Sequence, residues 1–313
     1  MQVSAQHASH IFLVRPAHFG ANPETASSNV FQSIMEQSES RKIAEQAQQE
    51  FDGLVAALEA NHVSYQVFED TDSPIKSDAV FPNNWLSTHA DGTVILYPMM
   101  APNRRTERRP DIVSGLQTPG GYEVKQLVDL THYEKQELYC EGTGSLCIDH
   151  ANGVLYACLS ARTHREVVMR VAEELEYDPL FFEAEAEGTA IYHTNVLLTI
   201  SEHFAILCAE VITNEEKRQL VINTLEKGKR QVELITKEQM YHFAGNVFPV
   251  VNKKGRVRIM LSQQAYDGLT VEQRARWAAY GKLVPVAIPT IERYGGGSIR
   301  CMIAGVHLPK AEM

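Results

Sequence analysis

Short apolar runs, paired across tight polar turns, recur along this chain with starts roughly 50 to 60 residues apart. In each copy a small or polar segment precedes an apolar run, and a turn then leads into a second apolar run. Turns such as Asp91-Gly92 and Asn152-Gly153 are strong signals for a β-hairpin. A fixed period of this kind predicts repeated supersecondary units. The five copies occupy residues 81–97, 141–159, 192–208, 243–261 and 294–306.

Between the hairpins the apolar residues change to helical spacing. Shorter helices are predicted at 166–176, 215–225 and 271–280, with Thr163 and the pair Thr213-Asn214 as caps of the first two. Strand pairs that alternate with helices are typical of an α/β fold. Five such units closing in a ring would bring their turns together at one centre. The longest predicted helix has one apolar face, made of Ile43, Ala47, Phe51, Leu54, Val55 and Leu58.

The repeat also bears on the number of domains. A chain of 313 residues suggests two domains, since one domain takes about 150 residues. The five units instead predict a single domain over residues 1–313.

Composition excludes several classes of function. The chain is 44% hydrophobic and 22% charged, with a net charge of −10, as in soluble globular proteins. The one dense basic run, Arg104-Arg105 with Arg108-Arg109, is too short to predict nucleic-acid binding. No apolar stretch reaches the roughly 18 residues of a transmembrane helix, and no signal peptide is visible. We therefore expect a cytoplasmic protein with no nucleic-acid or membrane partner.

Cysteine and glycine spacing argues against a bound metal or nucleotide. The glycines at 295–297 lack the G-x-G-x-x-G spacing of a phosphate-binding loop and are not expected to lead into a helix. The cysteines are odd in number and never spaced C-x-x-C, which favours reduced thiols and gives no zinc framework. We therefore expect no cofactor and no metal. These cysteines are Cys140, Cys147, Cys158, Cys208 and Cys301.

The last copy of the repeat holds the candidate nucleophile. Three glycines at 295–297 let the backbone take positive φ and pack against a ligand. Cys301 follows four residues later, before an apolar run at 302–306. A flexible loop that feeds a cysteine into a pocket suits a nucleophile. The same segment also suits a tight turn before a strand with a buried, inert cysteine, because free cysteines are often buried.

Glu141 and His193 occupy the corresponding turns of two other units, so ring closure would make them neighbours of Cys301. A cysteine, a histidine and a carboxylate together supply a nucleophile, a proton shuttle and an orienting group. A nearby histidine cation lowers the pKa of a thiol, and Glu141 would hold the imidazole in position.

From about residue 79 to 309 the chain resembles the guanidino-group-modifying, or pentein, superfamily, which includes arginine deiminases, dimethylarginine hydrolases and amidinotransferases. The motifs that carry the resemblance are Gly295-Gly296-Gly297 with Cys301, Glu141-Gly142-Thr143-Gly144 and His193-Thr194-Asn195. The resemblance implies a five-bladed α/β-propeller of ββαβ-type units around a central site. It also implies that Cys301, His193 and Glu141 are catalytic.

The resemblance extends to residues that would bind an amino-acid substrate. The segment Ser160-Ala161-Arg162-Thr163 matches a stretch whose arginine grips the substrate α-carboxylate in related enzymes. The segment Pro102-Asn103-Arg104-Arg105 resembles the stretch that supplies a second arginine, from either Arg104 or Arg105. An exposed strand end and a solvated loop are the alternative interpretations. Gly296, at the centre of the glycine run, would approach the substrate with its backbone.

Two aspartates clamp the guanidinium in arginine deiminases, whereas the matching positions here are Asn84 and Asn195. Asn83 precedes the first of them in a Phe-Pro-Asn-Asn-Trp segment. A buried cation without a partner is costly, while asparagine offers both a donor and an acceptor. This pattern suits a neutral ureido group, and the Asn-Asn-Trp segment resembles a bacterial branch of the superfamily associated with citrulline utilisation.

We therefore expect a C–N hydrolase of a ureido- or guanidino-bearing amino acid, acting through a covalent cysteine intermediate. An amidinotransferase, in which an amine replaces the water, is one alternative. A non-catalytic binding protein on the same propeller is another, although the complete set of Cys301, His193 and Glu141 argues against it. The expected partner is a small amino-acid substrate. A homodimer is left open.

Overall fold

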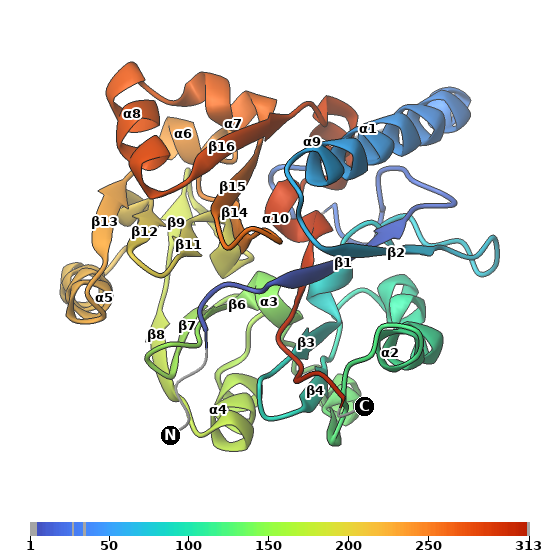
Figure 1. Cartoon of the computed structure of the whole chain (residues 1–313), viewed down its shortest axis with the longest axis horizontal. Coiled ribbons are helices and arrows are strands. Elements are labelled where there is room, and N and C mark those ends of the chain that lie inside the picture. The colour runs from blue at the N-terminus through green and yellow to red at the C-terminus, as the bar shows by residue number, and fades with distance from the viewer. Residues whose placement is uncertain (1–4, 27, 34–35, 312–313) are drawn as a thin grey trace.

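The computed structural model of the chain describes residues 5–26, 28–33 and 36–311. Five three-stranded sheets surround a common centre, and their connecting helices lie around the outside (Figure 1). In each sheet the first strand pairs antiparallel with the second, and the second pairs parallel with the third. A parallel pair needs a crossover connection, which the outer helices provide. The predicted five-bladed α/β-propeller is confirmed.

Four units follow one another along the chain. The first has β3 (Leu86–Thr88), β4 (Thr93–Leu96), α2 (Pro110–Gln117) and β5 (Gln126–Asp129). The second has β6 (Leu146–Asp149), β7 (Val154–Cys158), α4 (Arg165–Leu175) and β8 (Asp178–Phe182). The third has β11 (Leu198–Ile200), β12 (Phe204–Leu207), α5 (Glu215–Lys227) and β13 (Gln231–Leu234). The fourth has β14 (Phe248–Val251), β15 (Val257–Ser262), α7 (Gln263–Gly268), α8 (Val271–Tyr280) and β16 (Lys282–Val286).

The fifth unit combines the two ends of the chain. Its first strand, β17 (Ala304–Val306), comes from the C-terminal end, whereas β1 (His10–Arg15), α1 (Ser40–Ala60) and β2 (Tyr65–Glu69) come from the N-terminal end. Strand β1 pairs antiparallel with β17 and parallel with β2. The last copy of the sequence repeat therefore has no local second strand, because its partner lies at the other end of the sequence.

The predicted helices are present, with one corrected cap. Asn214 caps α5 by accepting a hydrogen bond from the backbone nitrogen of Lys217. The N-cap of α4 is His164 rather than Thr163, because the backbone nitrogen of Thr163 is used in a turn with the carbonyl of Ser160. Helix α1 buries the predicted apolar face against the sheet, except for Val55, which is half-buried.

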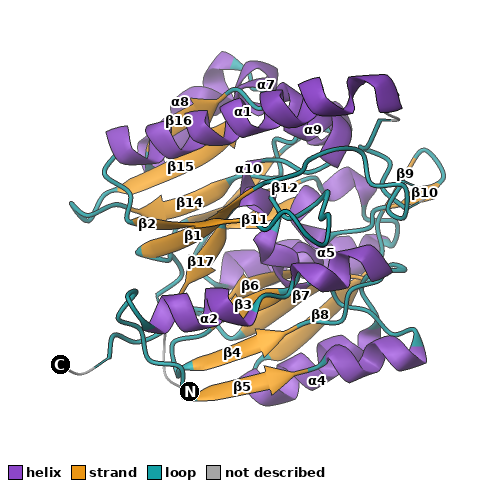
Figure 2. Cartoon of the chain, turned by 90° about the vertical axis from the view of Figure 1, so that its right-hand side faces the viewer, coloured by secondary structure: helices purple, strands orange, loops and turns teal. Residues whose placement is uncertain are grey.

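Helices and sheets form layers, with strands inside and helices outside (Figure 2). None of the helices in the described ranges is both long and apolar enough to span a membrane. Three short elements lie within units: η1 (Gln37–Glu39), η3 (Pro102–Glu107) and η6 (Ala209–Val211). Others join successive units: η4 (Thr131–Gln136), β9 (Glu185–Ala186), β10 (Thr189–Ala190), α6 (Lys237–Tyr241) and α9 (Pro289–Gly295).

A short turn precedes the first strand of every unit and lies near the centre of the ring. Four of these turns are helical: η2 (Pro82–Asn84), α3 (Gly142–Ser145), η5 (Thr194–Val196) and α10 (Ile299–Met302). The fifth is the turn at 243–246 before β14. The glycine run was expected to be a flexible loop that does not enter a helix. It instead links α9 to α10, because Gly296 takes a φ of 61° and reverses the chain between them.

Candidate active site

The glycine run places Cys301 on α10, next to a small cavity. A Cβ at Gly295 would lie 2.7 Å from the ring of Phe81, and one at Gly296 would lie 2.5 Å from the amide of Asn29. Only residues without a side chain allow these close approaches. Asn29 in turn donates hydrogen bonds to the carbonyls of Gly295 and Gly296, at 3.2 and 3.4 Å. Cys301 is therefore held by a packed turn.

Two asparagine amides contact the sulfur of Cys301, which is 5% exposed. The Nδ2 atom of Asn195 lies 3.6 Å from Sγ, and Nδ2 of Asn246 lies 3.4 Å from it. Asn246 is held by a 2.8 Å hydrogen bond from its Nδ2 to the carbonyl of Asn195. The Oδ1 atom of Asn246 also faces the sulfur, as the acceptor of a 3.6 Å hydrogen bond from the thiol.

His193 and Glu141 form a buried pair, with Nε2 of the imidazole 2.8 Å from Oε2 of the carboxylate. Burial lowers the pKa of His193 to about 4, although the carboxylate opposes this shift. Burial also disfavours ionisation of Glu141, but the charge of Arg162 and the bond from His193 outweigh it and lower the pKa of that carboxyl. A neutral imidazole that donates from Nε2 keeps Nδ1 free as a proton acceptor.

The empty space at Cys301 amounts to about 280 Å³, part of which is open solvent, so the cavity itself is small. Part of its wall comes from the N-terminal segment 22–33, through Thr25 and Asn29, and Tyr192 donates a 2.7 Å hydrogen bond to the carbonyl of Gly296. The lining residues are Thr25, Asn29, Asp78, Phe81, Asn84, Arg104, Arg162, Tyr192, His193, Gly295, Gly296, Gly297 and Cys301.

Arg162 lines the cavity, and its buried guanidinium contacts both the N-terminal segment and Glu141. It donates to Oγ of Ser28 at 2.6 Å and to the carbonyl of Thr25 at 3.1 Å. Its Nη1 lies 3.4 Å from Oε2 of Glu141. The side chain is therefore a buried cation at the cavity wall, in contrast to the exposed strand end that was the alternative interpretation.

Arg104 and Arg105 have different surroundings. Arg104 lines the cavity, forms a two-pronged ion pair with Glu107 at 2.8 and 2.9 Å, and donates to Oδ1 of Asn84 at 3.0 Å. Arg105 lies outside the lining of the cavity, where it donates to the carbonyl of Met99. The predicted substrate role of Arg105 does not match this position, because consecutive residues of η3 point in different directions.

Of the two asparagines in the Phe-Pro-Asn-Asn segment, Asn84 lines the cavity and Asn83 does not. The Asn83 side chain is fully buried and has no hydrogen-bond partner among the described residues, and its backbone carbonyl accepts a bond from Thr143. The predicted residues that come together around Cys301 are therefore His193, Glu141, Asn84, Asn195, Arg162 and Gly296.

The sequence interpretation missed two residues at the site. Asn246 ends the turn of the fourth unit, at the position that corresponds to Cys301 in the fifth, so the repeat itself carried a signal for it. Asp78 lines the cavity, accepts a 2.7 Å bond from Asn22 and lies 3.5 Å from Arg104. Asp78 lies before the repeat copy begins, and nothing in the pattern marked it.

A family model described as N,N dimethylarginine dimethylhydrolase, eukaryotic, matches residues 15–308 of the chain. No curated protein sequence is significantly similar to it.

Solved structures share the fold at low sequence identity. The N-terminal domain of ArgZ, an arginine dihydrolase from the ornithine–ammonia cycle in cyanobacteria, has been solved covalently bound to a reaction intermediate. That structure aligns with a TM-score of 0.74 and 16% identity, over 96% of this chain and 99% of that one. The chain spans only 40% of full-length ArgZ, with a TM-score of 0.69 and 15% identity. The structure of a dimethylarginine dimethylaminohydrolase adduct with 4-chloro-2-hydroxymethylpyridine aligns with a TM-score of 0.63 and 16% identity. The alignment covers 95% of this chain and 99% of that one.

Proposed function

Because the chain belongs to the N,N-dimethylarginine dimethylhydrolase family of the pentein superfamily, we propose that it hydrolyses a non-peptide C–N bond through a covalent intermediate on Cys301. The substrate is an α-amino acid with a ureido group, of the citrulline type. Cys301 and His193 line one cavity, and Glu141 is hydrogen-bonded to His193; this arrangement supports the proposal. So does the fold shared with ArgZ, which has been captured covalently bound to a reaction intermediate.

In the first half of the proposed reaction the Cys301 thiol transfers its proton to Nδ1 of His193, and the sulfur attacks the central carbon of the ureido group. The imidazolium, stabilised by Glu141, then returns the proton to the departing nitrogen. In the second half neutral His193 takes a proton from water, and the hydroxide releases the carbon from sulfur. Glu141 stays ionised throughout, because Arg162 and His193 both favour its charged form.

The observation that carries the substrate assignment is the set of amides at the sulfur. Asn195 and Asn246 contact Cys301, and Asn84 lines the same cavity with an Nδ2 that has no partner among the described residues. An asparagine can donate to and accept from a neutral ureido group. None of these three side chains supplies a counter-charge for a guanidinium.

The carboxylates near the cavity already have partners. Glu107 pairs with Arg104, while Glu141 pairs with His193 and Arg162. Asp78 accepts from Asn22 and lies near Arg104, and burial raises the pKa of its carboxyl. A substrate cation would have to displace one of these partners, and breaking a buried pair is costly.

A guanidino substrate of the arginine type is the second candidate, and two observations favour it. The matching family is named for dimethylarginine, and ArgZ is an arginine dihydrolase. Asp78 also lines the cavity, so one carboxylate lies within reach of a bound cation. In both candidates the α-carboxylate binds to Arg162, with Arg104 beside it.

Ammonia and amino-acid products should be measured with citrulline, arginine, a methylarginine and agmatine, using Cys301→Ala as the blank. We expect turnover of citrulline in preference to arginine, and none of agmatine, which lacks the carboxylate for Arg162. Efficient turnover of arginine with no action on citrulline would establish the second candidate. If an amidino group is transferred to an added amine, the protein is an amidinotransferase and not a hydrolase. No turnover of any compound, together with a slowly labelled thiol at position 301, would favour a binding protein.

A further inference from the structure

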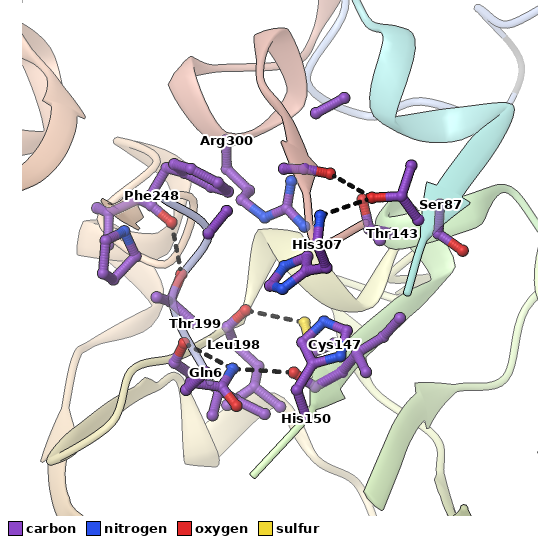
Figure 3. Close-up of a pocket in the computed structure, with 18 of the residues that line it drawn as sticks. Gln6, Ser87, Thr143, Cys147, His150, Leu198, Thr199, Phe248, Arg300 and His307 are labelled. Atoms are coloured by element: carbon purple, nitrogen blue, oxygen red, sulfur yellow. Dashed lines mark hydrogen bonds between the residues drawn. The ribbon is translucent and has the colours of Figure 1, made fainter. Parts of the chain in front are cut away.

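A second cavity lies along the centre of the ring and shares no lining residue with the cavity at Cys301. The first strands of all five units, β3, β6, β11, β14 and β17, contribute to its wall. Its volume is about 750 Å³, part of which is open to solvent. Figure 3 shows the side chains of Arg300, Thr143, Cys147, His150 and His307 around this space.

Arg300 gives this central cavity its positive charge. It precedes Cys301 on α10, so adjacent residues line two different cavities. Its Nη1 donates to the carbonyl of Ile303 at 3.1 Å, and its guanidinium lies 5.1 Å from the ring centre of Phe248. Arg300 forms no ion pair with any carboxylate in the described ranges.

No lining residue of the central cavity is acidic, so the Arg300 charge meets no counter-charge there. The other ionisable groups of the lining are the thiol of Cys147, whose pKa is raised by burial, and two imidazoles, His150 and His307, whose ring centres lie 4.1 Å apart. Burial lowers the pKa of His150 to about 3 and that of His307 well below its ordinary value, so both rings are neutral. Each neutral imidazole still carries one N–H donor. A partly buried cation with polar donors and no carboxylate is an environment that favours an anion.

We propose that this central cavity binds a small oxyanion, a carboxylate or a phosphate, through the guanidinium of Arg300. The planar fork of an arginine matches two oxygens of either group, and this geometry makes arginine the preferred side chain for both. The ligand would lie behind α10, separate from the substrate. The oxyanion could be the carboxylate of an organic acid or inorganic phosphate.

The site is also coupled to the nucleophile. Arg300 and Cys301 are consecutive residues of α10, so the cation lies next to the residue that carries the sulfur. An anion bound to Arg300 cancels part of that positive charge and adds a negative charge near the sulfur. Occupation of the central cavity is thus expected to slow the reactions of Cys301 without competing with the substrate.

Isothermal titration with inorganic phosphate, and separately with acetate, tests the site directly at constant ionic strength. Binding should weaken about tenfold or more in Arg300→Gln, because a charge-assisted hydrogen bond is lost. It should be unchanged in Arg256→Gln, which removes an exposed arginine. Whichever of the two anions binds more tightly identifies the source. No binding of either anion, or equal binding in all three proteins, would overturn the proposal.

A second measurement needs no substrate, so its failure is distinguishable from failure of the proposed function. The rate of Cys301 alkylation by iodoacetamide, followed on its own peptide by mass spectrometry, should fall when phosphate or acetate is added to the unmodified protein. In Arg300→Gln the rate should be lower from the start and insensitive to the anion. If that variant does not fold, Arg300→Lys keeps the charge without the fork, and it should bind the anion more weakly while staying responsive. An anion-independent rate in the unmodified protein would contradict the coupling.

Discussion

Asn84, Asn195 and Asn246 occupy corresponding turns of three units, and two of them contact the sulfur of Cys301. Their arrangement shows how a repeated backbone turn can carry different chemistry in each unit. The carboxylate comes from the second unit, the imidazole from the third and the sulfur from the fifth. Glu141 and His193 precede the helical turns of their units, whereas Cys301 lies within the turn of its own unit.

Replacing Cys301 by alanine should abolish turnover, by about a thousandfold or more, because the proposed covalent intermediate forms on its sulfur. The matched control is Cys208→Ala, which removes another buried thiol from the third unit. Steady-state kinetics on folded protein, checked by circular dichroism, measure the effect. Substantial activity in the Cys301 variant would refute the covalent mechanism, whatever the control does.

Replacing both Asn84 and Asn195 by aspartate should move preference from citrulline toward arginine. The change adds two carboxylates at the cavity, and a charge-assisted hydrogen bond contributes roughly 1.5 to 3 kcal/mol. The ratio of kcat/KM for the two substrates should therefore shift by about one to two orders of magnitude. Asn223→Asp adds a charge on the exposed face of α5 and serves as the control. An unchanged ratio in the double variant would show that these asparagines do not select the substrate.

At the scale of elements, local pattern predicted the helices α1, α4, α5 and α8 and the hairpins of four units, but it missed the shorter helices α2, α6, α7 and α9. The Asp-Gly and Asn-Gly turns marked β3–β4 and β6–β7 because hairpin formation depends on neighbours in sequence. The helical turn at Cys301 was missed because four residues carry too little periodicity to be recognised. Arg104 and Arg105 could not be separated either, since the side-chain directions in η3 depend on contacts with Glu107 and Met99.

The link between α9 and α10 makes the glycine run a test of element geometry. Gly296→Ala places a Cβ 2.5 Å from Asn29 and in the left-handed region, which should destabilise the fold by about 1–3 kcal/mol. Gly255→Ala is the matched control, because Gly255 also has a positive φ, of 69°, but nothing lies within 4 Å of the added Cβ. Activity should fall in the first variant only. If both variants lost the same amount of stability and both kept full activity, the turn at Gly296 would not position Cys301.

At the scale of the whole molecule, buried histidines dominate the response to acid. Burial lowers the pKa to about 4 for His7, His10 and His193, to about 3 for His89 and His150, and well below its ordinary value for His307. Between pH 6.5 and 4 the unfolded chain therefore binds protons that the native protein does not. Lowering the pH favours whichever state binds more protons, and here that is the unfolded state. These six groups therefore decrease the free energy of unfolding as the pH falls.

Three buried acids oppose this trend. Burial raises the pKa of Glu107 and Glu292 to about 7 and also raises that of Asp78, so the native state holds their protons more tightly. The histidines outnumber them, and we expect the free energy of unfolding, measured in urea, to decrease steadily from pH 6.5 to 4. Replacing exposed His132 should leave that slope unchanged. If the free energy of unfolding stayed constant or increased as the pH falls from 6.5 to 4, the buried histidines would not control stability in acid.

Closure of the ring depends on a pairing between the two ends of the chain. Phe12 on β1 pairs in register with Ala304 on β17, three residues beyond Cys301, and its fully buried ring packs in a cluster with Trp85 and Val94 of the neighbouring unit. Sequence periodicity could not reveal this pairing, because it predicts units and not the partner of an unpaired terminal strand.

Phe12→Ala should therefore destabilise the protein by about 3–5 kcal/mol, the usual effect of removing a buried phenylalanine. Because the same strands carry α10 and the closure of the ring, unfolding in urea should stay a single transition, with the Cys301 thiol and the tryptophan fluorescence changing together. Leu220→Ala, at a position 43% exposed on α5, should change stability by less than about 0.5 kcal/mol. If the Phe12 variant instead exposed Cys301 well before the tryptophans changed environment, the fifth unit would be an independent element, and closure between the chain ends would not stabilise the other four.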